Sequence, residues 1–291
     1  MTAPFLTEAR APLTQSIVAT NEAGEQEAVS IPAERSLTMY VDKREIVTLM
    51  TLGVNPELLV LGYLLNQKLI VAASDVDSIT VDWEGAEEGG VAAVKTHAGI
   101  AAIEERTSRR VVTTGCGQGS IFGGLLDDID AIKLPDARLP QAALFEILSL
   151  IRQQDTTYKS SGSVHGCALF RVDSQTKAAA LLHHVEDVGR HNALDTLAGW
   201  MSLQATSNKA STSADLADPH DASADLVLYT TGRLTSEMVI KSAQMGVPFV
   251  VSRSGITQMG FDVATRLGLG TIGRALNTRY LCYTGAGKIE R

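Results

Sequence analysis

The alternation of apolar and polar positions predicts a first structural region over residues 1–135. One amphipathic helix is expected there, because Asn55 fits an N-cap, Pro56 fits the first turn, and a leucine face of Leu58, Leu61 and Leu65 follows. Residues 1–35 are polar and mixed, so we expect an arm or edge segment without a core of its own. Apolar runs predict strands at 36–41, 45–51, 76–83, 90–96 and 110–114. Together these elements predict a smaller α+β domain.

The second region, residues 136–291, has a different pattern, in which predicted strands are separated by predicted helices. Its first helix has an apolar stripe at Leu144, Ile147, Leu148 and Ile151. The tract at 203–223 is rich in Ser, Ala and Asp, which predicts a mobile loop. Strands at 167–172, 178–185, 226–229, 247–251, 270–273 and 279–283 are separated by helices at 191–201, 236–245 and 257–267. This alternation predicts a larger α/β domain with a mainly parallel sheet, whose ligands bind beyond the carboxyl ends of the strands.

Length and composition agree with two domains and exclude some classes of protein. The chain has 291 residues, against a prior of about 150 residues per domain. Its net charge of -8 argues against binding to nucleic acid backbones, which needs a basic surface. No apolar run approaches the roughly 20 residues of a membrane span, and the start of the chain has no leader pattern. We therefore expect a cytoplasmic protein that contacts neither nucleic acid nor membrane.

Three predicted turns after strands carry unusual polar residues, at 186–192, 230–233 and 252–255. Each contains an arginine at or near a helix start, where free backbone N–H groups attract anions and a guanidinium adds bidentate reach to phosphate. One such turn alone would be a cap with a surface ion pair, but three together predict a phosphate-bearing ligand. The residues assigned to this site are Asp187, Arg190, His191, Arg233, Ser252, Arg253, Arg274, Ala275, Leu276, Asn277, Thr278 and Arg279.

Two of these residues have a second interpretation. Asp187 could recognise the ring N–H groups of a purine, or it could cap its own helix. His191 could be a buried structural group, or it could hold a nearby thiol as the thiolate or donate to a ligand oxygen. The pair His183 and His184 has no suitable ligand partners in the sequence, so we interpret both as structural.

Cys116 is the candidate for covalent chemistry. It stands between Gly115 and Gly117 after an apolar run, so its thiol can meet a large group at a loop tip, although a plain glycine turn is the alternative. The cysteines number three and are scattered, which argues against disulfides and zinc ribbons. His184 and Glu186 match half of a zinc deaminase signature, but its Pro-Cys-x-x-Cys half is missing, so we expect no metal site and no metal-dependent nucleoside deaminase.

Several segments together resemble the FdhD family of formate dehydrogenase accessory sulfurtransferases. The segment EDVGRHNALD at 186–195 is similar to the family's hallmark, and TGCG at 114–117 resembles its reactive-cysteine loop. The helix turn from Gly232 to Lys241 and the VSRS run at 251–254 agree as well, and so does the closing stretch from 263 to 284. The resemblance covers roughly residues 36–285.

The resemblance implies a larger domain of three layers, similar to the cytidine deaminase fold without its zinc site. It also implies a homodimer that acts as a sulfurtransferase. Cys116 would accept sulfur as a persulfide from a cysteine desulfurase and transfer it to the molybdenum cofactor of formate dehydrogenase. That substrate is Mo-bis(molybdopterin guanine dinucleotide), whose pyrophosphates Arg233, Arg253, Arg274 and Arg279 would meet.

One departure from the family pattern concerns the release of sulfur. Many members have a second cysteine in the loop, where this chain has Gly119, and some have another before His165, where this chain has Ser163 and Val164. A neighbouring thiol therefore cannot attack the persulfide in this loop, and Cys167 or Cys282 could substitute only if folding brings them close. The alternative function is a cofactor-binding chaperone without persulfide chemistry.

Overall fold

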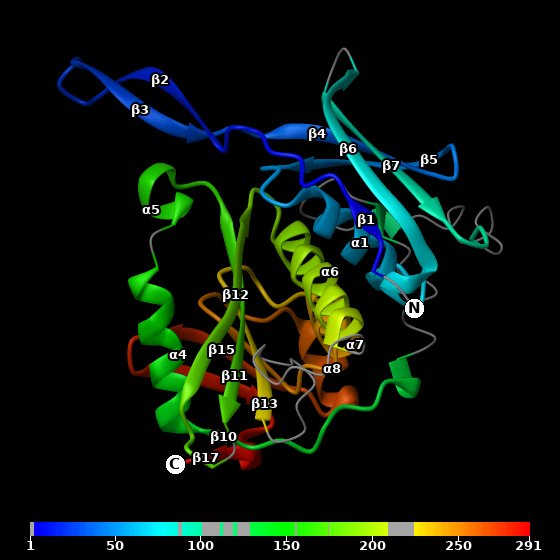
Figure 1. Ribbon diagram of the computed structural model, residues 1–291. Coiled ribbons are helices and arrows are strands. Elements are labelled where there is room, and N and C mark those ends of the chain that lie inside the picture. Colours follow the sequence, from blue (N-terminus) through cyan, green and yellow to red (C-terminus); the bar gives the residue numbers. More distant parts are fainter. Residues whose placement is uncertain are drawn as a thin grey trace.

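Two mixed β-sheets, one in each half of the chain, organise the computed structural model (Figure 1). It describes residues 3–86, 89–100, 111–112, 119–120, 129–154, 156–173, 175–208 and 224–291. The N-terminal sheet has the strand order β1-β6-β7-β4-β5. Its strands are β1 (Phe5–Leu6), β4 (Arg35–Val41), β5 (Arg44–Thr51), β6 (Val76–Ala86) and β7 (Gly89–Thr96). The expected α+β arrangement of this half is therefore present.

Local chemistry explains the tightest turn of this sheet. β4 and β5 pair antiparallel and are joined only by Asp42 and Lys43, which both have positive φ, 47° and 71°. Two positive φ values are what a two-residue hairpin of type I′ requires, since its twist matches that of the strands. The helix α1 (Pro56–Asn66) packs on this sheet, and their shared core includes Leu37, Leu49 and Leu61.

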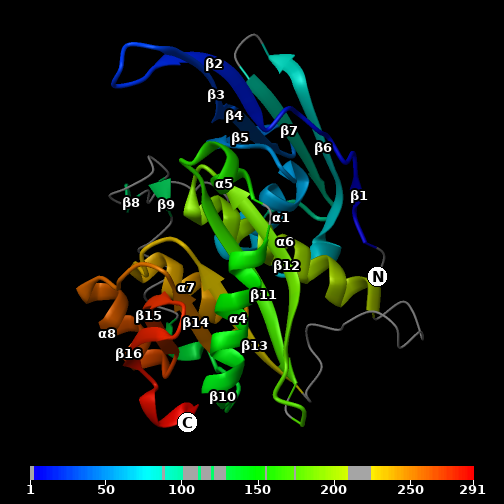
Figure 2. The same ribbon diagram turned by 90° about the vertical axis from the view of Figure 1, so that its left-hand side faces the viewer.

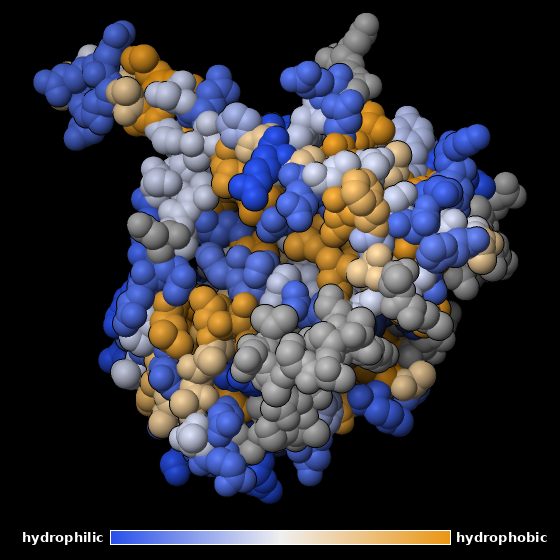
Figure 3. All heavy atoms as spheres, viewed as in Figure 1, coloured by the Kyte–Doolittle hydropathy of each residue, from blue (hydrophilic) through white to orange (hydrophobic). Residues whose placement is uncertain are grey.

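Residues before β4 form the expected arm. β2 (Thr14–Thr20) and β3 (Gln26–Pro32) pair only with each other and project from the body (Figure 1). Apolar side chains are exposed on this hairpin, with Val18 67% accessible (Figure 3). A lone two-stranded hairpin has too little buried surface to be stable by itself, so the arm depends on its attachment to the body.

The C-terminal sheet has the order β12-β11-β13-β14-β15-β16. The sequence predicted a mainly parallel sheet, and this prediction is wrong. Only β13–β14 and β14–β15 are parallel pairs, whereas β11 is antiparallel to both of its neighbours and β15–β16 is a hairpin. Short direct connections impose the antiparallel pairs β11–β12 and β15–β16, since parallel neighbours need a crossover, whereas β12 and a long helix separate β11 from β13 in the chain. The strands are β11 (His165–Asp173), β12 (Ala179–Asp187), β13 (Ala224–Thr230), β14 (Phe249–Ser252), β15 (Gly270–Leu276) and β16 (Arg279–Thr284).

Helices cover both faces of this sheet, and Figure 2 shows α4 on the near side. One face packs against α4 (Gln141–Gln153) through Val227, Phe249 and Val251. The other face, with Leu228 and Val250, packs against α6 (Arg190–Asn208), α7 (Ser236–Gln244) and α8 (Gln258–Leu267). Because neighbouring side chains of a strand point to opposite faces, each strand contributes to two cores, and the result is three layers.

Short elements complete the described chain. They are α5 (Thr157–Ser161), the 3₁₀ turns Ala73–Asp75, Ile129–Ala131 and Ala286–Lys288, and the strands β8 (Val111–Val112), β9 (Gly119–Ser120), β10 (Leu139–Pro140) and β17 (Ile289–Glu290). The predicted loop at 203–223 is wrong in its first part, because α6 continues to Asn208. There Leu203 packs against the N-terminal core, a contact that extends the helix past its local polar sequence. Residues 113–118, with Cys116, lie outside the described residues.

The two halves meet where α1 crosses α6. A Cβ added to Gly62 would overlap the carbonyl oxygen of Asp195, and one added to Gly199 would overlap the carbonyl oxygen of Leu58. α1 is consequently buried on nearly all sides and not on the single leucine face that the sequence predicted, since it is enclosed by the sheet and by α6.

We expect Gly62→Ala and Gly199→Ala each to lower the free energy of unfolding by about 3 kcal/mol, because neither backbone can move aside without separating the helices. Alanine otherwise favours a helix over glycine by up to about 1 kcal/mol, so the sign of the change is diagnostic. Thermal and denaturant unfolding measure it. Gly287→Ala is the matched control, since nothing lies within 4 Å of an added Cβ there. Unchanged stability in the two helix variants would mean that the crossing is looser than the structure has it.

Candidate functional site

The polar turns singled out in the sequence lie together at one edge of the C-terminal sheet. β12, β13, β14 and β15 run in the same direction, so their carboxyl ends share this edge. Hydrogen bonds join the turns directly: Arg253 N donates to Thr230 O at 3.0 Å, and Ser252 Oγ donates to Gly232 O at 2.7 Å. Arg274 N in turn donates to Ser254 O at 2.7 Å. The edge is thus one continuous polar surface.

A pocket of about 190 Å³ opens at this edge on the side of α4. Four of the residues assigned from the sequence line it, namely Arg253, Ala275, Leu276 and Asn277. Arg253 is exposed, and Ala275 is buried beneath it in the sheet core. Thr278 and three further arginines, Arg233, Arg274 and Arg279, are exposed at the same edge but do not line the pocket. The pocket therefore takes up part of the predicted anion site, with further cations around it.

Two cationic residues of the pocket were missed in the sequence. Arg152, in the last turn of α4, donates from Nη1 to Asn277 Oδ1 at 3.0 Å, and Lys159 lies on α5. A basic residue in the last turn of a helix usually complements the helix dipole, so the local sequence offered no reason to assign either to a ligand. Together with Arg253 they make three cationic side chains around one small pocket, against the single acidic side chain of Glu186, and this excess of positive charge suits a phosphate.

Asp187 is buried, and protein donors occupy its carboxylate. Oδ1 accepts from Gly189 N at 3.0 Å and from Asn192 Nδ2 at 2.9 Å. Oδ2 accepts from Thr51 Oγ1 at 2.5 Å and from Leu52 N at 3.0 Å. None of these four donors is a backbone N–H of α6, so the carboxylate fixes the turn before the helix and ties that turn to the end of β5. A purine would have to displace these four donors.

His191 is buried beside an ionic cluster of the helices. Lys241 Nζ lies 2.9 Å from Asp195 Oδ2 and 3.1 Å from Glu237 Oε1, and all three side chains are at most 5% exposed. Burial lowers the pKa of Lys241, but the two carboxylates more than offset it, so its pKa is raised and the pairs stay charged. His191 Nε2 lies 3.6 Å from Glu237 Oε2 and has no hydrogen-bond partner among the described residues.

Burial determines the charge of His191. It lowers the pKa of the imidazole to about 3, despite the opposing effect of Glu237, so the ring is neutral near pH 7. A neutral imidazole cannot supply the positive charge that keeps a thiol ionised. Arg190 starts α6 and packs against Gly232, where an added Cβ would lie 2.7 Å from its Cδ. Charge for a thiolate must come from such arginines.

The two described cysteines lie far apart in the C-terminal sheet, and their distance from the Cys116 loop lies outside the described residues. Cys167 is fully buried on β11, its thiol donates to Thr230 Oγ1 at 3.3 Å, and burial raises its pKa to about 12. Cys282 lies on β16, four strands away, and donates to Thr284 O at 3.2 Å. At about 4.8 Å per strand step the two are roughly 19 Å apart, so folding does not bring them together.

Neither a metal site nor a membrane-spanning helix is found in the ranges that the structure describes. No group of three or more His, Cys, Asp or Glu side chains in these ranges could hold a metal ion. Among the helices of the described chain, none is long and apolar enough to cross a membrane.

Protonation of His191 should destabilise the fold in mild acid. Its pKa in the folded chain is about 3, below the unfolded value of 6.5, so between these values the unfolded chain binds the extra proton. Stability therefore falls as the pH drops through 6.5 towards 3, by about 2 kcal/mol at about pH 5. We expect His191→Asn to lose about this much less on acidification than the wild type, as measured by urea unfolding. The exposed His97→Asn serves as control, and an unchanged slope for His191→Asn would show that folding does not lower the pKa of this imidazole.

Comparison with known proteins identifies the family. The model of the FdhD/NarQ family matches residues 32–290. Proteins named sulfur carrier protein FdhD are similar over most of their length: that of Listeria innocua is 26% identical, with 89% of this chain and 91% of the relative covered, and that of Bacillus subtilis is 28% identical, with 88% and 89% covered. The crystal structure of a candidate formate dehydrogenase accessory protein from Desulfotalea psychrophila has the same fold, with a TM-score of 0.72, 24% identity, and 96% of this chain and all of that chain covered. The chain belongs to the FdhD/NarQ family.

Proposed function

We propose that this protein is a sulfur carrier that serves a formate dehydrogenase. The observation that carries the proposal is the cationic pocket at the sheet edge, where Arg152, Lys159 and Arg253 converge beside the 275–277 turn. An accessory protein that delivers sulfur to a large anionic cofactor needs such a site to hold it. The names of the FdhD relatives support the sulfur-carrier role. The resemblance to accessory sulfurtransferases supports formate dehydrogenase as the enzyme that the carrier serves.

The substrate held at this edge is proposed to be Mo-bis(molybdopterin guanine dinucleotide). Its pyrophosphates would contact Arg253 and Arg152, and the exposed Arg233, Arg274 and Arg279 would extend the anion site. The pocket, at about 190 Å³, has room for one end of the dinucleotide only. The remainder would lie along the exposed arginines, which accounts for cations outside the pocket.

Cys116 is proposed as the residue that carries the sulfur. Its thiolate would attack the outer sulfur of a persulfide on a cysteine desulfurase, the desulfurase thiolate would leave, and Cys116 would retain the outer sulfur as a persulfide. No external oxidant or reductant is needed for this exchange, because the sulfur keeps its oxidation state. The next acceptor is proposed to be the bound cofactor and not a second thiol of this chain, because burial raises the pKa of Cys167 and of Cys282 and keeps both thiols protonated and poorly nucleophilic near pH 7. We further propose that the protein acts in the cytoplasm as a homodimer.

Incubation with a cysteine desulfurase and cysteine should add the mass of one sulfur atom to the intact protein. The added mass should be lost on treatment with a thiol reductant and should be absent from Cys116→Ala. The variants Cys167→Ala and Cys282→Ala are the matched controls and should still gain it. A wild-type protein whose mass does not change would end the persulfide mechanism.

GDP is a tractable probe of the cofactor site. Arg253→Ala should weaken GDP binding by about tenfold or more, since a charge-assisted hydrogen bond contributes about 1.5 to 3 kcal/mol. Calorimetric titration of the full chain measures this, and Arg138→Ala, an exposed arginine outside the pocket, should bind as the wild type does. Equal GDP affinity in Arg253→Ala would contradict the assignment. If Cys116→Ala activated formate dehydrogenase while Arg253→Ala did not, the alternative of a cofactor-binding chaperone would replace the sulfur carrier.

A further inference from the structure

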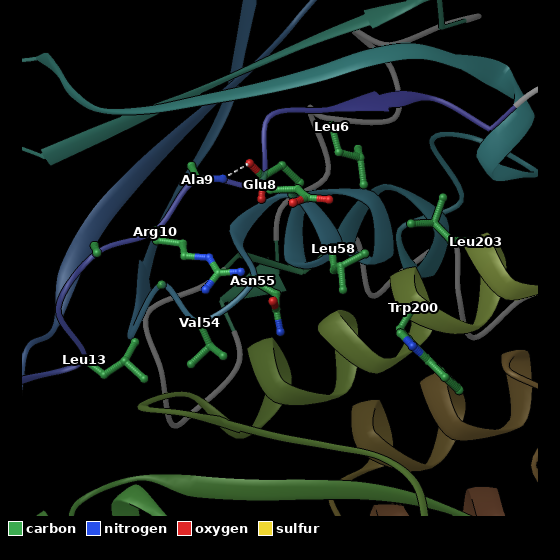
Figure 4. Close-up of a pocket in the computed structure, with 13 residues that line it drawn as sticks. Leu6, Glu8, Ala9, Arg10, Leu13, Val54, Asn55, Leu58, Trp200 and Leu203 are labelled. Atoms are coloured by element: carbon green, nitrogen blue, oxygen red, sulfur yellow. Dashed lines mark hydrogen bonds between the residues drawn. The ribbon is translucent and has the colours of Figure 1, made fainter.

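A second pocket lies between the two halves of the molecule, beneath residues 6–13 (Figure 4). Its volume is about 580 Å³, which is within the range of small-molecule sites. Helix α1 forms one wall, and α6 forms the other with Trp200 and Leu203. None of its lining residues belongs to the pocket at the sheet edge. Figure 3 shows apolar surface between the two halves in the same view as Figure 1.

The roof of this pocket is held in place by specific hydrogen bonds. Thr7 Oγ1 and Ala9 N both donate to Glu57 Oε1 on α1, at 2.6 and 2.7 Å. Thr7 Oγ1 also accepts from Val81 N at 2.9 Å, which ties the segment to β6. Between these anchors Glu8 has a φ of 54°, a value that non-glycine residues rarely adopt, so the chain turns there. The roof is therefore a built part of the pocket wall.

The polar groups of the pocket are of both charges: Glu8 and Arg10 on the roof have exposed side chains, whereas Glu57 is buried and holds the roof in place. Figure 4 shows Arg10 from the roof and Asn55 from the start of α1 directed into the same space. Asn55 makes no side-chain cap bond to α1, and Arg10 has no ion pair with a described residue. Glu8 lines the same pocket two residues before Arg10, also without an ion pair to the described chain. The roof thus offers one exposed carboxylate and one exposed guanidinium to the pocket.

The rest of the lining is apolar. Leu58 of α1 and Leu203 of α6 face the pocket, with Trp200 beside them (Figure 4). The indole of Trp200 stacks on His183, with ring centroids 4.8 Å apart and an angle of 3° between the planes. Burial lowers the pKa of His183 to about 4, so this stack stays neutral near pH 7. One rigid aromatic ring and aliphatic side chains provide a surface for an apolar group.

We propose that this pocket binds a free apolar α-amino acid, as an effector or ligand separate from the sulfur-transfer site. Its carboxylate would be held by Arg10 and Asn55, its ammonium by Glu8, and its side chain by Leu58, Leu203 and Trp200. A zwitterion is the simplest ligand that satisfies both charges of the roof at once. A plain carboxylate makes no ion pair with Glu8, and an amine makes none with Arg10. Each of these ligands should therefore bind more weakly than the zwitterion.

The roof precedes the part of the chain that the family model matches, residues 32–290. Glu8 and Arg10 therefore lie outside the residues that the model matches, whereas Asn55 lies within them. Because the ligand would bridge the N-terminal segment, α1 and α6, its binding would also stabilise the contact between the two halves of the chain.

Trp200 provides a direct readout. The chain has two tryptophans, so Trp83→Phe leaves Trp200 as the only indole emitter. We expect L-leucine to change its emission saturably at about pH 7. The matched analogues 4-methylpentanoate, which lacks the ammonium, and 3-methylbutylamine, which lacks the carboxylate, should bind at least tenfold more weakly. Because Trp83 packs against Gly53 and Gly90, a calorimetric titration of the wild type with L-leucine repeats the measurement without that substitution.

Variants of the roof complete the test. Glu8→Gln and Arg10→Gln should each weaken leucine binding at least tenfold, Arg10→Lys should retain part of it, and Arg138→Gln should leave it unchanged. Absence of saturable binding by both methods overturns the proposal. So does equal binding of leucine and 4-methylpentanoate together with an unaffected Glu8→Gln, which would make the site one for simple carboxylates. None of these variants touches the pocket at the sheet edge, so a negative result leaves the sulfur-carrier function as it stands.

Discussion

The close crossing of α1 and α6 is the contact on which the rest of the structure depends. Gly62 and Gly199 bring the two helix backbones together with no room for a side chain. α1 belongs to the N-terminal sheet and α6 to the C-terminal three-layer unit, so this crossing sets the position of one half against the other. Since van der Waals contact between backbones has little tolerance, a shift of one helix would shift everything attached to it.

Buried polar groups then fix the direction and register of that contact. Asn66 Nδ2 of α1 donates to Asp195 Oδ1 of α6 at 2.6 Å, and the other oxygen of Asp195 pairs with Lys241 of α7. Asp187 makes the second tie, from the end of β12 to the end of β5. Removing one partner of such a pair leaves a buried charge uncompensated, which is far more costly than the pair is stabilising. These ties therefore specify one arrangement of the two halves, and with it the edge where the ligand pocket lies.

The polar segment at 186–195 consequently has a mainly architectural role in its buried part. Asp187, Asn192 and Asp195 make their hydrogen bonds to other protein groups, whereas Glu186 of the same segment lines the ligand pocket together with cationic groups from α4, α5 and the turn after β14. We therefore propose two roles for this edge of the C-terminal sheet. One side of the edge holds the two halves of the chain together, and the other side binds a phosphate-bearing substrate through its cationic side chains. His191 lies on the buried side and is neutral, which limits it to hydrogen bonding.

Periodicity, caps and the order of elements were sufficient to predict the α/β class, the start of α1, the arm, the strands and the polar turns at one sheet edge. Each of these features depends either on neighbours within a few residues or on a general rule of chain topology. Burial and charge state were not predictable in this way. Thr51 and Asp187 are 136 positions apart in the chain, and Arg152 and Asn277 are 125 apart. Whether a carboxylate is a cap or a ligand, whether an imidazole is charged, and which lysine or arginine joins a pocket are decided by such distant contacts. The sequence by itself determined which chemical groups this protein has and at which strand ends they stand, and only the tertiary structure decided which of them remain free to meet a ligand.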